Sequence, residues 1–375
     1  MGNPKAEIAA VVDASAQPKS NLNPNLVSLS RLREQYQCPT FSTVEEMFAK
    51  DPKLAASVDG AIVCTPHATH SDIGRFLLEQ AQQRQQTKGG KPLHILMEKP
   101  MTTNIDQAKY LHDAVQKSSY GSFMINHSAN YIPQTRAARD LIASGDIGEI
   151  RHITGFFASP LSWIFEDPSN KGWNEPTPGL MLGNGFSWGQ QSHLLSWIYH
   201  VSGPSLKPEC VFCTMGYSHK TGADVSHSAT IQCNNGATFS LSGTSLLPGN
   251  AHSDPPVAKQ IKIKIYGSKG ALIYMGDDRD KNSGRLELRI GGEEAGEREG
   301  NIEVYCEELG FLFEELDQDG IGPQSLQNFI AACLGEKDYY NGADSLVGLK
   351  SVQTLDAMYR SDDSGQPEDV KYREI

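Results

Sequence analysis

The sequence lacks the features that define membrane, secreted and nucleic-acid-binding proteins. No uncharged apolar run approaches the ~18 residues that a membrane-spanning helix needs. Basic residues are in deficit, 33 against 45 acidic ones, and the formal charge of −12 argues against binding nucleic-acid phosphates or an anionic membrane. The N-terminus shows no basic segment followed by an apolar one, so we expect no signal peptide and a cytoplasmic protein.

Cysteine is scarce and scattered. The seven cysteines form neither an even disulfide framework nor a zinc-ligand pattern. Cys210 and Cys213 make a single C-x-x-C pair, which we interpret as two residues of one strand. We therefore expect no metal site.

Short apolar strands alternate with amphipathic helices over residues 7–126. This alternation is typical of a parallel sheet covered by helices. The expected strands span residues 7–13, 58–64, 93–97 and 122–126. The expected helices span residues 43–50, 69–85 and 104–118, and Thr43 and Asn104 are suited to cap the first and the last.

The pattern changes after residue 126. Residues 260–266 alternate strictly between polar and apolar side chains, which favours an antiparallel sheet with one solvated face. A long loop rich in Pro, Gly and Trp spans residues 159–185, and helices are expected at 133–144, 190–201, 325–334 and 343–360. We predict two domains, a parallel α/β domain over 1–126 and an α+β domain over 127–375.

Two polar clusters follow predicted parallel strands. Thr65, Pro66, His67 and His70 follow the strand at 58–64, and Glu98 with Lys99 follows the strand at 93–97. Ligands bind at the carboxyl ends of such strands. A lysine buried there can have a lowered pKa and serve as an acid or base. The alternatives are an ordinary strand-to-helix turn and a solvated surface pair.

A third cluster ends the long loop. Gln190 and His193 fall early in the helix expected at 190–201, behind a glycine-rich stretch and a Trp-rich loop. A histidine beside a glutamine in this setting suits proton transfer to a polar, ring-shaped ligand. A histidine packed in the core is the alternative.

Together these clusters resemble one family. The motifs are Glu98-Lys99-Pro100, Thr65-Pro66 with His70, and the runs at 140–149, 265–271 and 325–330. In order and spacing they are similar to the glucose–fructose oxidoreductase / inositol dehydrogenase / MocA (Gfo/Idh/MocA) family. The resemblance implies a Rossmann-type domain, a C-terminal domain with an open, mainly antiparallel sheet, and NAD- or NADP-linked redox chemistry on sugars, polyols or related molecules. It also implies homo-oligomers that form through that sheet.

The resemblance assigns roles to individual residues. Lys99 would lie near nicotinamide and substrate, His193 matches the catalytic histidine, and Asp13 would bind the adenosine ribose, which favours NAD over NADP. The other expected substrate contacts are Trp173 and Gln190. The other expected cofactor contacts are Thr65, Pro66, His67, His70, Glu98 and Asn126.

The sequence departs from this family in three places. It lacks the first strand and the glycine-rich turn that cradles the pyrophosphate, so we hypothesise that it is truncated at its start and expect unpaired strand edges. Gly189 stands where the family has an aspartate four residues before the histidine, and Asn130 where an arginine is common. Lys99 and His193 remain as the acid–base pair.

Our leading hypothesis is therefore an NAD(P)-dependent oxidoreductase acting on a carbohydrate-like alcohol or carbonyl. The alternative is a non-catalytic family member that binds sugar or acts as an oligomeric interaction protein, which the missing turn and Gly189 favour. A hydrolase using Ser192 or Cys213 lacks the G-x-S-x-G elbow that would support it.

Overall fold

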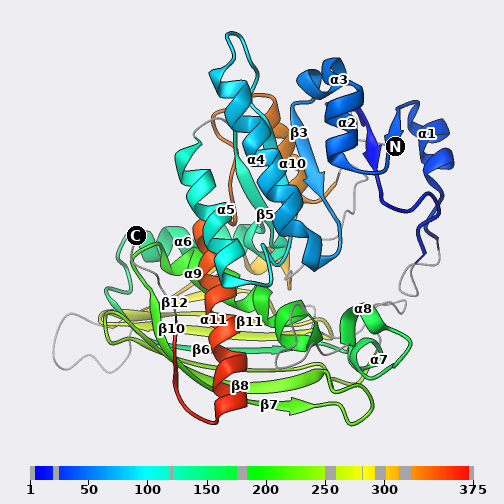
Figure 1. Cartoon of the computed structure of the whole chain (residues 1–375). Coiled ribbons are helices and arrows are strands. Elements are labelled where there is room, and N and C mark those ends of the chain that lie inside the picture. Colours follow the sequence, from blue (N-terminus) through cyan, green and yellow to red (C-terminus); the bar gives the residue numbers. More distant parts are fainter. Residues whose placement is uncertain are drawn as a thin grey trace.

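The structure is a computed structural model of the chain. It describes residues 5–19, 25–118, 121–174, 184–249, 259–280, 282–291, 301–311 and 322–370. Figure 1 shows two regions, a helix-rich N-terminal one and a C-terminal one built on a broad sheet.

The N-terminal parallel strands form two separate groups. β1 (Val11–Val12) pairs with β2 (Thr40–Phe41), and β3 (Gly60–Val63), β4 (His94–Glu98) and β5 (Phe123–Asn126) form a second sheet in that order. No strand of the described residues joins the two groups. This division is the arrangement expected when a central strand is missing from a parallel sheet.

Helices surround these strands, and their starts follow the predicted caps. The Thr43 hydroxyl accepts from Glu46 N at 3.0 Å, and the Asn104 amide oxygen accepts from Asp106 N at 2.9 Å. The helices of this region are α1 (Leu29–Tyr36), α2 (Val44–Lys50), α3 (Pro52–Ser57), α4 (His70–Gln86) and α5 (Ile105–Lys117).

The C-terminal sheet has nine strands in the order β13-β12-β11-β10-β6-β9-β8-β7-β14. Only β6 and β9 pair in parallel; the other neighbours in the sheet are antiparallel. The strands are β6 (Ile150–Ala158), β7 (Pro208–Tyr217), β8 (Asp224–Cys233), β9 (Thr238–Thr244), β10 (Gln260–Gly267), β11 (Gly270–Asp277), β12 (Leu286–Ile290), β13 (Asn301–Tyr305) and β14 (Glu368–Asp369).

The inner face of this sheet belongs to the larger hydrophobic core, which also takes in side chains of β3, β4 and β5. Along β10, Ile261, Ile263 and Ile265 are at most 1% exposed, whereas Lys262 between them is exposed. The alternation predicted for residues 260–266 is therefore confirmed. The C-x-x-C pair lies within β7, as interpreted, and Cys213 is buried there.

Helices between the two regions join them. α11 (Ser345–Ser364) contacts α5 and β5 on one side and α9 and β7 on the other, and Figure 1 shows it passing from one region to the other. α10 (Gln324–Cys333) packs on β4, where Phe329 clusters with Leu96 and Met124. The remaining helices are α6 (Pro133–Ala143), α7 (Ser162–Phe165), α8 (Lys171–Asn174) and α9 (Ser192–Ser202).

The packing of α10 and α11 makes contacts across the predicted domain boundary at residue 126. α10 and α11 follow β6 to β13 of the C-terminal sheet in sequence and precede its β14, but both contact strands of the N-terminal sheet. Within the described residues, no helix combines the length and apolar character needed to cross a membrane. The same residues contain no cluster of three or more His, Cys, Asp or Glu side chains placed to hold a metal ion.

Candidate active site

Three neighbouring parallel strands bring predicted site residues to one edge of the sheet. Thr65, Glu98 and Asn126 lie at or just after the carboxyl ends of β3, β4 and β5. Glu98 lies beside Asn126 in the register, and the Asn126 amide Nδ2 donates to Glu98 Oε1 at 2.5 Å. Glu98 Oε2 also accepts from the backbone N of Lys99 at 3.2 Å. The Glu98 carboxylate is thus held by two neutral donors.

The Lys99 side chain reaches from the end of β4 to the C-terminal half of the chain. Its Nζ donates to the backbone carbonyl of Gly189 at 2.6 Å. Gly189 belongs to η3 (Ser187–Gln191), a π-helical turn that leads directly into α9. Burial lowers the pKa of the Lys99 ammonium to about 8, and the charge of Glu98 opposes this shift. Lys99 can therefore exchange a proton close to neutral pH.

Two buried histidines lie near Lys99. The rings of His127 and His193 meet edge to face, with centroids 5.6 Å apart. Burial, and then the charge of Lys99, lowers both pKa values, that of His127 to about 3 and that of His193 well below its usual value. Both imidazoles are therefore neutral near pH 7, and a neutral imidazole can accept a proton.

The charge of a second lysine, Lys259, also acts on this group. Lys259 precedes β10, and its charge, after those of Lys99 and His127, contributes to the lowered pKa of His193. Burial lowers the pKa of Lys259 to about 8; Asp278 opposes the shift and Lys99 adds to it. The structure thus places Lys99 near His193 and His127, and the charge of Lys259 acts on His193. That Lys99 and His193 act as an acid–base pair stays a prediction.

Sequence analysis missed His127 and Lys259, although each left a signal. His127 follows β5 directly and so occupies the strand-end position that singled out Pro66 and Lys99. Lys259 falls in phase with the apolar side chains of the strand at 260–266, which places a lysine on a face that is otherwise isoleucine.

The residues after β3 divide into two roles. His70 is fully buried, and its Nδ1 and Nε2 lie 2.8 and 2.9 Å from the carbonyl oxygens of Pro100 and Thr65. In this structure His70 therefore ties the ends of β3 and β4 together, and its expected contact with a cofactor stays a prediction. His67 lies edge to face with Trp173 of α8, at 5.5 Å between centroids.

The buried carboxylate of Asp224 holds the π-helical turn η3 in place. Asp224, at the start of β8, accepts from Ser187 N and from the Tyr359 hydroxyl, both at 2.8 Å. Burial raises the pKa of Asp224 to about 6, and these hydrogen bonds oppose the shift. A Cβ at Gly185 would lie 1.8 Å from Asp224 Oδ1, so only glycine fits this approach. The contact of Asp224 with Ser187 N positions the turn that contains Gly189, whose carbonyl accepts from Lys99 Nζ.

The departures at positions 189 and 130 have different surroundings. Among the described residues, a Cβ at Gly189 would meet only the Phe165 ring, at 3.5 Å, which is an ordinary van der Waals contact. Asn130 is fully buried and donates to Ser196 Oγ and Gly342 O, both at 2.9 Å. Asn130 thus links α9 to the segment before α11.

Several buried polar atoms around Lys99 and His193 have no hydrogen-bond partner among the residues that the structure describes. A dinucleotide's nicotinamide amide and a sugar's hydroxyls present complementary donors and acceptors, so these atoms fit both groups. They are Asn126 Oδ1, His127 Nδ1, Gln190 Oε1, Gln191 Oε1 and Nε2, and Ser192 Oγ.

The adenosine end of a dinucleotide would fall at β1. Asp13 directly follows this strand, is partly buried, and accepts from Ser15 N at 2.7 Å. A carboxylate at this place fits ribose hydroxyls. The two ends of the expected cofactor therefore find suitable residues, whereas the described residues between β1 and β3 contain no glycine-rich cradle for its pyrophosphate.

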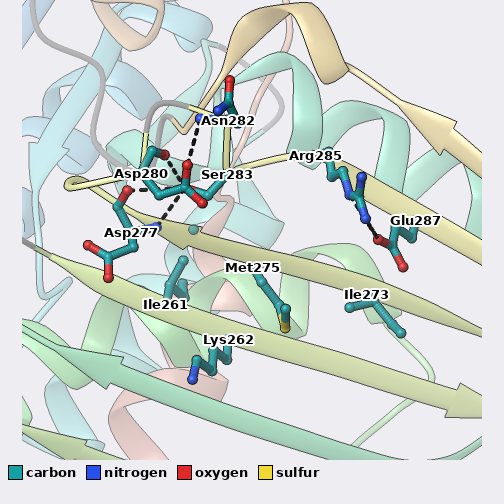
Figure 2. A pocket seen from close by; sticks show the side chains of 11 residues that line it. Ile261, Lys262, Ile273, Met275, Asp277, Asp280, Asn282, Ser283, Arg285 and Glu287 are labelled. Atoms are coloured by element: carbon teal, nitrogen blue, oxygen red, sulfur yellow. Dashed lines mark hydrogen bonds and ion pairs between the residues drawn. The ribbon is translucent and has the colours of Figure 1, made fainter.

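A separate pocket lies on the C-terminal sheet and shares no residue with this group. It has a volume of about 380 Å³ and spans β10, β11 and β12. Figure 2 shows Asp277, Asp280 and Ser283 gathered at one end and the Arg285–Glu287 pair at the other. Arg285 Nε donates to Glu287 Oε1 at 2.9 Å. The polar groups of this pocket are largely engaged with one another.

Comparison with protein families identifies the chain. Residues 1–127 match the oxidoreductase family with an NAD-binding Rossmann fold, and residues 135–273 match the GFO/IDH/MocA C-terminal domain. These matches show an NAD-binding oxidoreductase of the Rossmann type. The chain belongs to the GFO/IDH/MocA family, as its motifs suggested.

Solved structures share the fold over nearly the whole chain. An NAD-binding oxidoreductase from Klebsiella pneumoniae is 16% identical with a TM-score of 0.67, covering 98% of this chain and 90% of that one. Levoglucosan dehydrogenase in complex with NADH is 17% identical with a TM-score of 0.65, covering 98% and 91%. The WlbA dehydrogenase from Bordetella pertussis, in complex with NADH and UDP-GlcNAcA, is 19% identical with a TM-score of 0.62, covering 98% and 92%. Among curated protein sequences, none matches this chain.

Proposed function

We propose that this protein is an NAD(H)-dependent dehydrogenase acting on an alcohol or carbonyl group of a carbohydrate-like molecule. The observation that carries the proposal is the hydrogen bond from Lys99 Nζ to Gly189 O. This bond joins the strand end that carries Lys99 to the turn that leads into His193. Family membership supplies the expectation of redox chemistry.

The chain's own residues would move the proton. The neutral His193 imidazole would accept the proton of a substrate hydroxyl, and the Lys99 ammonium would stabilise negative charge that develops on the same oxygen. Bound NAD would supply the hydride chemistry. Glu98 and Asn126, held to each other, would position Lys99 and offer Asn126 Oδ1 to the nicotinamide end.

We also infer which residues at the edges of the site would contact the cofactor and the substrate. Asp13 would bind the adenosine ribose and favour NAD over NADP, because a carboxylate repels a 2′-phosphate. His67, with Thr65 and Pro66, would flank the cofactor. Trp173, packed against His67, and Gln190 would contact the substrate.

The test begins with nicotinamide fluorescence. Titration with NADH and NADPH should show binding, tighter for NADH, and a screen of sugars and polyols should then show NADH production from NAD. Lys99→Ala and His193→Ala should each lower kcat by about 100-fold or more with an unchanged circular dichroism spectrum. Lys53→Ala, an exposed lysine of α3, serves as the control. Unchanged kcat in Lys99→Ala would remove this lysine from the mechanism.

A non-catalytic sugar-binding role is the second candidate, and Gly189 favours it. The family's carboxylate is absent at this position, and the Gly189 carbonyl takes a hydrogen bond from Lys99 instead. A protein that binds NADH and a sugar without hydride transfer under any condition of the screen would support this role over the dehydrogenase.

We infer, finally, that copies of the chain associate through the outer face of the C-terminal sheet. This face carries exposed large apolar side chains, which is unusual for a solvated sheet. They are Phe212 (44% exposed), Tyr266 (37%), Met275 (42%), Ile302 (55%) and Val304 (42%). The inferred association is between identical subunits, with no nucleic acid or membrane involved.

A further inference from the structure

We propose that His70 works as an imidazolium that binds a backbone carbonyl in each of the loops after β3 and β4, a contact that we call the His70 clamp. The clamp makes His70 a positioning residue for Lys99 and for the expected cofactor contacts Thr65 and Pro66. The family resemblance, by contrast, implied that His70 touches the cofactor itself. The positioning role rests on the proposed function, whereas the charge of the ring does not.

Both ring nitrogens of His70 lie against carbonyl oxygens. Nδ1 is 2.8 Å from Pro100 O, Nε2 is 2.9 Å from Thr65 O, and the side chain is fully buried. A carbonyl oxygen can only accept, so each contact is a hydrogen bond only where the ring nitrogen carries a proton. The imidazolium has a proton on both nitrogens. The neutral ring has one, and it would turn a lone pair toward the other carbonyl.

The neutral ring would therefore hold only one of the two loops. A lone pair that points at a carbonyl oxygen at hydrogen-bond distance is repulsive, and a buried carbonyl that loses its donor is costly. Charged donors form hydrogen bonds that are stronger than those of neutral donors. Burial by itself favours the neutral ring. The observation that favours the charged ring is the geometry, with an acceptor on each side.

The charges around His70 act in both directions. His70 is the first residue of α4, where the positive end of the helix dipole disfavours a charged ring. Asp72, in the first turn of the same helix, opposes that effect. Glu98 and Lys99 precede Pro100 and carry opposite charges. The other titratable side chains of the segments that meet here are Cys64, before Thr65, and His67, whose ring centroid lies 5.9 Å from that of His70.

The two loops that the clamp joins carry the candidate site. Pro100 follows Lys99 directly, and Thr65 with Pro66 opens the segment after β3. Loss of the bond to Pro100 would release the backbone that carries Lys99. Loss of the bond to Thr65 would release the expected cofactor contacts. Because the clamp needs both ring protons, it holds at low pH and opens as the pH rises.

The charge of His70 can be read directly by NMR. The full chain is made with isotope-labelled histidine, and long-range proton–nitrogen correlation spectra of the rings are recorded between about pH 6 and about pH 9. The signals of His70 are those lost in His70→Gln or, where that variant does not fold, those left after the other histidines are replaced in turn. At about pH 6 we expect protons on both ring nitrogens of His70, and on only one at the high end of the range.

His94 is the matched control, because its surroundings require a bare nitrogen. Ser122 N donates to His94 Nδ1 at 3.0 Å, so this nitrogen is an acceptor. Burial lowers the pKa of His94, and the same spectra should show it mainly neutral at about pH 6. A bare ring nitrogen on His70 at about pH 6 would overturn the proposal, with no cofactor or substrate needed to see it.

NADH binding tests the positioning role. The dissociation constant for NADH, measured by nicotinamide fluorescence, should rise about tenfold as His70 loses its proton, with the same midpoint as in the spectra. His70→Gln should show the weaker affinity at every pH, because an amide carries its donors on one atom only. His112→Gln is the control, since His112 lies beside Ser345 Oγ at 3.0 Å on α5, and it should keep the wild-type pH dependence.

The titration of Lys99 has to be told apart from that of His70. The pKa of Lys99 is about 8 and falls in the same range, so Lys99→Met should retain the change in NADH affinity that follows His70. A change that persists undiminished in His70→Gln, or that disappears in Lys99→Met, would assign it to Lys99 and overturn the positioning role.

The clamp and the proposed function can fail separately. If both nitrogens of His70 are protonated but NADH does not bind, the charged ring stands and the dehydrogenase proposal falls. If NADH binds and its affinity does not follow the protonation of His70, the dehydrogenase proposal stands and the positioning role falls.

Discussion

The two sheets of this protein differ in how completely they are covered. In the N-terminal sheet, Ile62, Leu96 and Met124 are neighbours in one row across β3, β4 and β5, and their exposure falls from 51% to 3% to 0%. In the C-terminal sheet, Ile261, Ile263 and Ile265 are at most 1% exposed along a single strand. One sheet is open at β3, whereas the other has a continuous buried face.

The two regions contribute different parts of the candidate site. The N-terminal strands supply Lys99, Glu98 and Asn126 at their ends, as parallel strands do in many enzymes. The C-terminal region supplies the support: Asp224 of β8 fixes the turn that receives Lys99, and α9 carries His193. A site shared in this way depends on both sheets.

The sharpest test of this comparison is one substitution made in both sheets. Ile263→Ala on β10 should lower the free energy of unfolding by about 2–5 kcal/mol, because it leaves a cavity in a packed core. Ile62→Ala on β3 removes the same atoms from a half-exposed side chain and should cost below about 1 kcal/mol. Urea unfolding followed by tryptophan fluorescence measures both. Equal losses would show that the exposed edge of β3 is covered in solution.

A smaller effect is expected at the contact that fixes the π-helical turn. The pKa of Asp224 rises from 3.8 to about 6 on folding, so the folded state binds this proton more tightly than the unfolded state does. The contribution of Asp224 to stability is therefore highest at low pH and falls as pH rises from about 4 to about 6. His227 stays neutral over this window in the folded state, because burial lowers its pKa to about 3; its protonation in the unfolded state is unaffected by a substitution at Asp224 and cancels when variant and wild type are compared.

Asp224→Asn removes this titration. The difference in unfolding free energy between wild type and Asp224→Asn, measured by urea titration at several pH values, should shift against the wild type as pH rises through that window. Asp363→Asn, an exposed aspartate in α11, should leave the slope unchanged. A wild-type slope that persists in Asp224→Asn would place the titrating group elsewhere.

The smallest expected effect concerns the outer face of the C-terminal sheet. Met275→Glu places a charge on this face and should raise the dissociation constant of the oligomer by about tenfold. Size-exclusion chromatography with light scattering, run over a range of concentrations, measures the change. Tyr36→Glu makes the same kind of change at an equally exposed apolar residue of α1 and should have no effect. A wild-type chain that is monomeric at all concentrations would contradict the inferred association.

Local patterns predicted much of the fold. The caps Thr43 and Asn104 set the starts of α2 and α5, and the alternation at 260–266 marked the buried face of β10. Strand ends identified Lys99 and Glu98, since a chain leaving a parallel strand exposes its next residues at the sheet edge. These features depend on neighbours within a few residues.

Contacts between distant segments could not be predicted in this way. The Lys99–Gly189 bond joins residues 90 positions apart and uses a backbone carbonyl, which no side-chain motif can signal. His70 lies in the motif of a cofactor contact, and its two ring nitrogens lie within hydrogen-bond distance of the carbonyl oxygens of Thr65 and Pro100, a contact that the motif does not signal. Lys259 and His193 lie far apart in the sequence, and the charge of Lys259 acts on His193 only in the folded chain.

The sequence by itself therefore determined the elements, the family and the two chemical groups Lys99 and His193. Tertiary structure decided the pKa values of these two side chains and which residues lie next to them. Burial lowers the pKa values of Lys99, His127 and His193, and burial is a property of the packed chain. Electrostatic coupling acts across space rather than along the chain, so only the folded structure shows that the charge of Lys259 acts on His193.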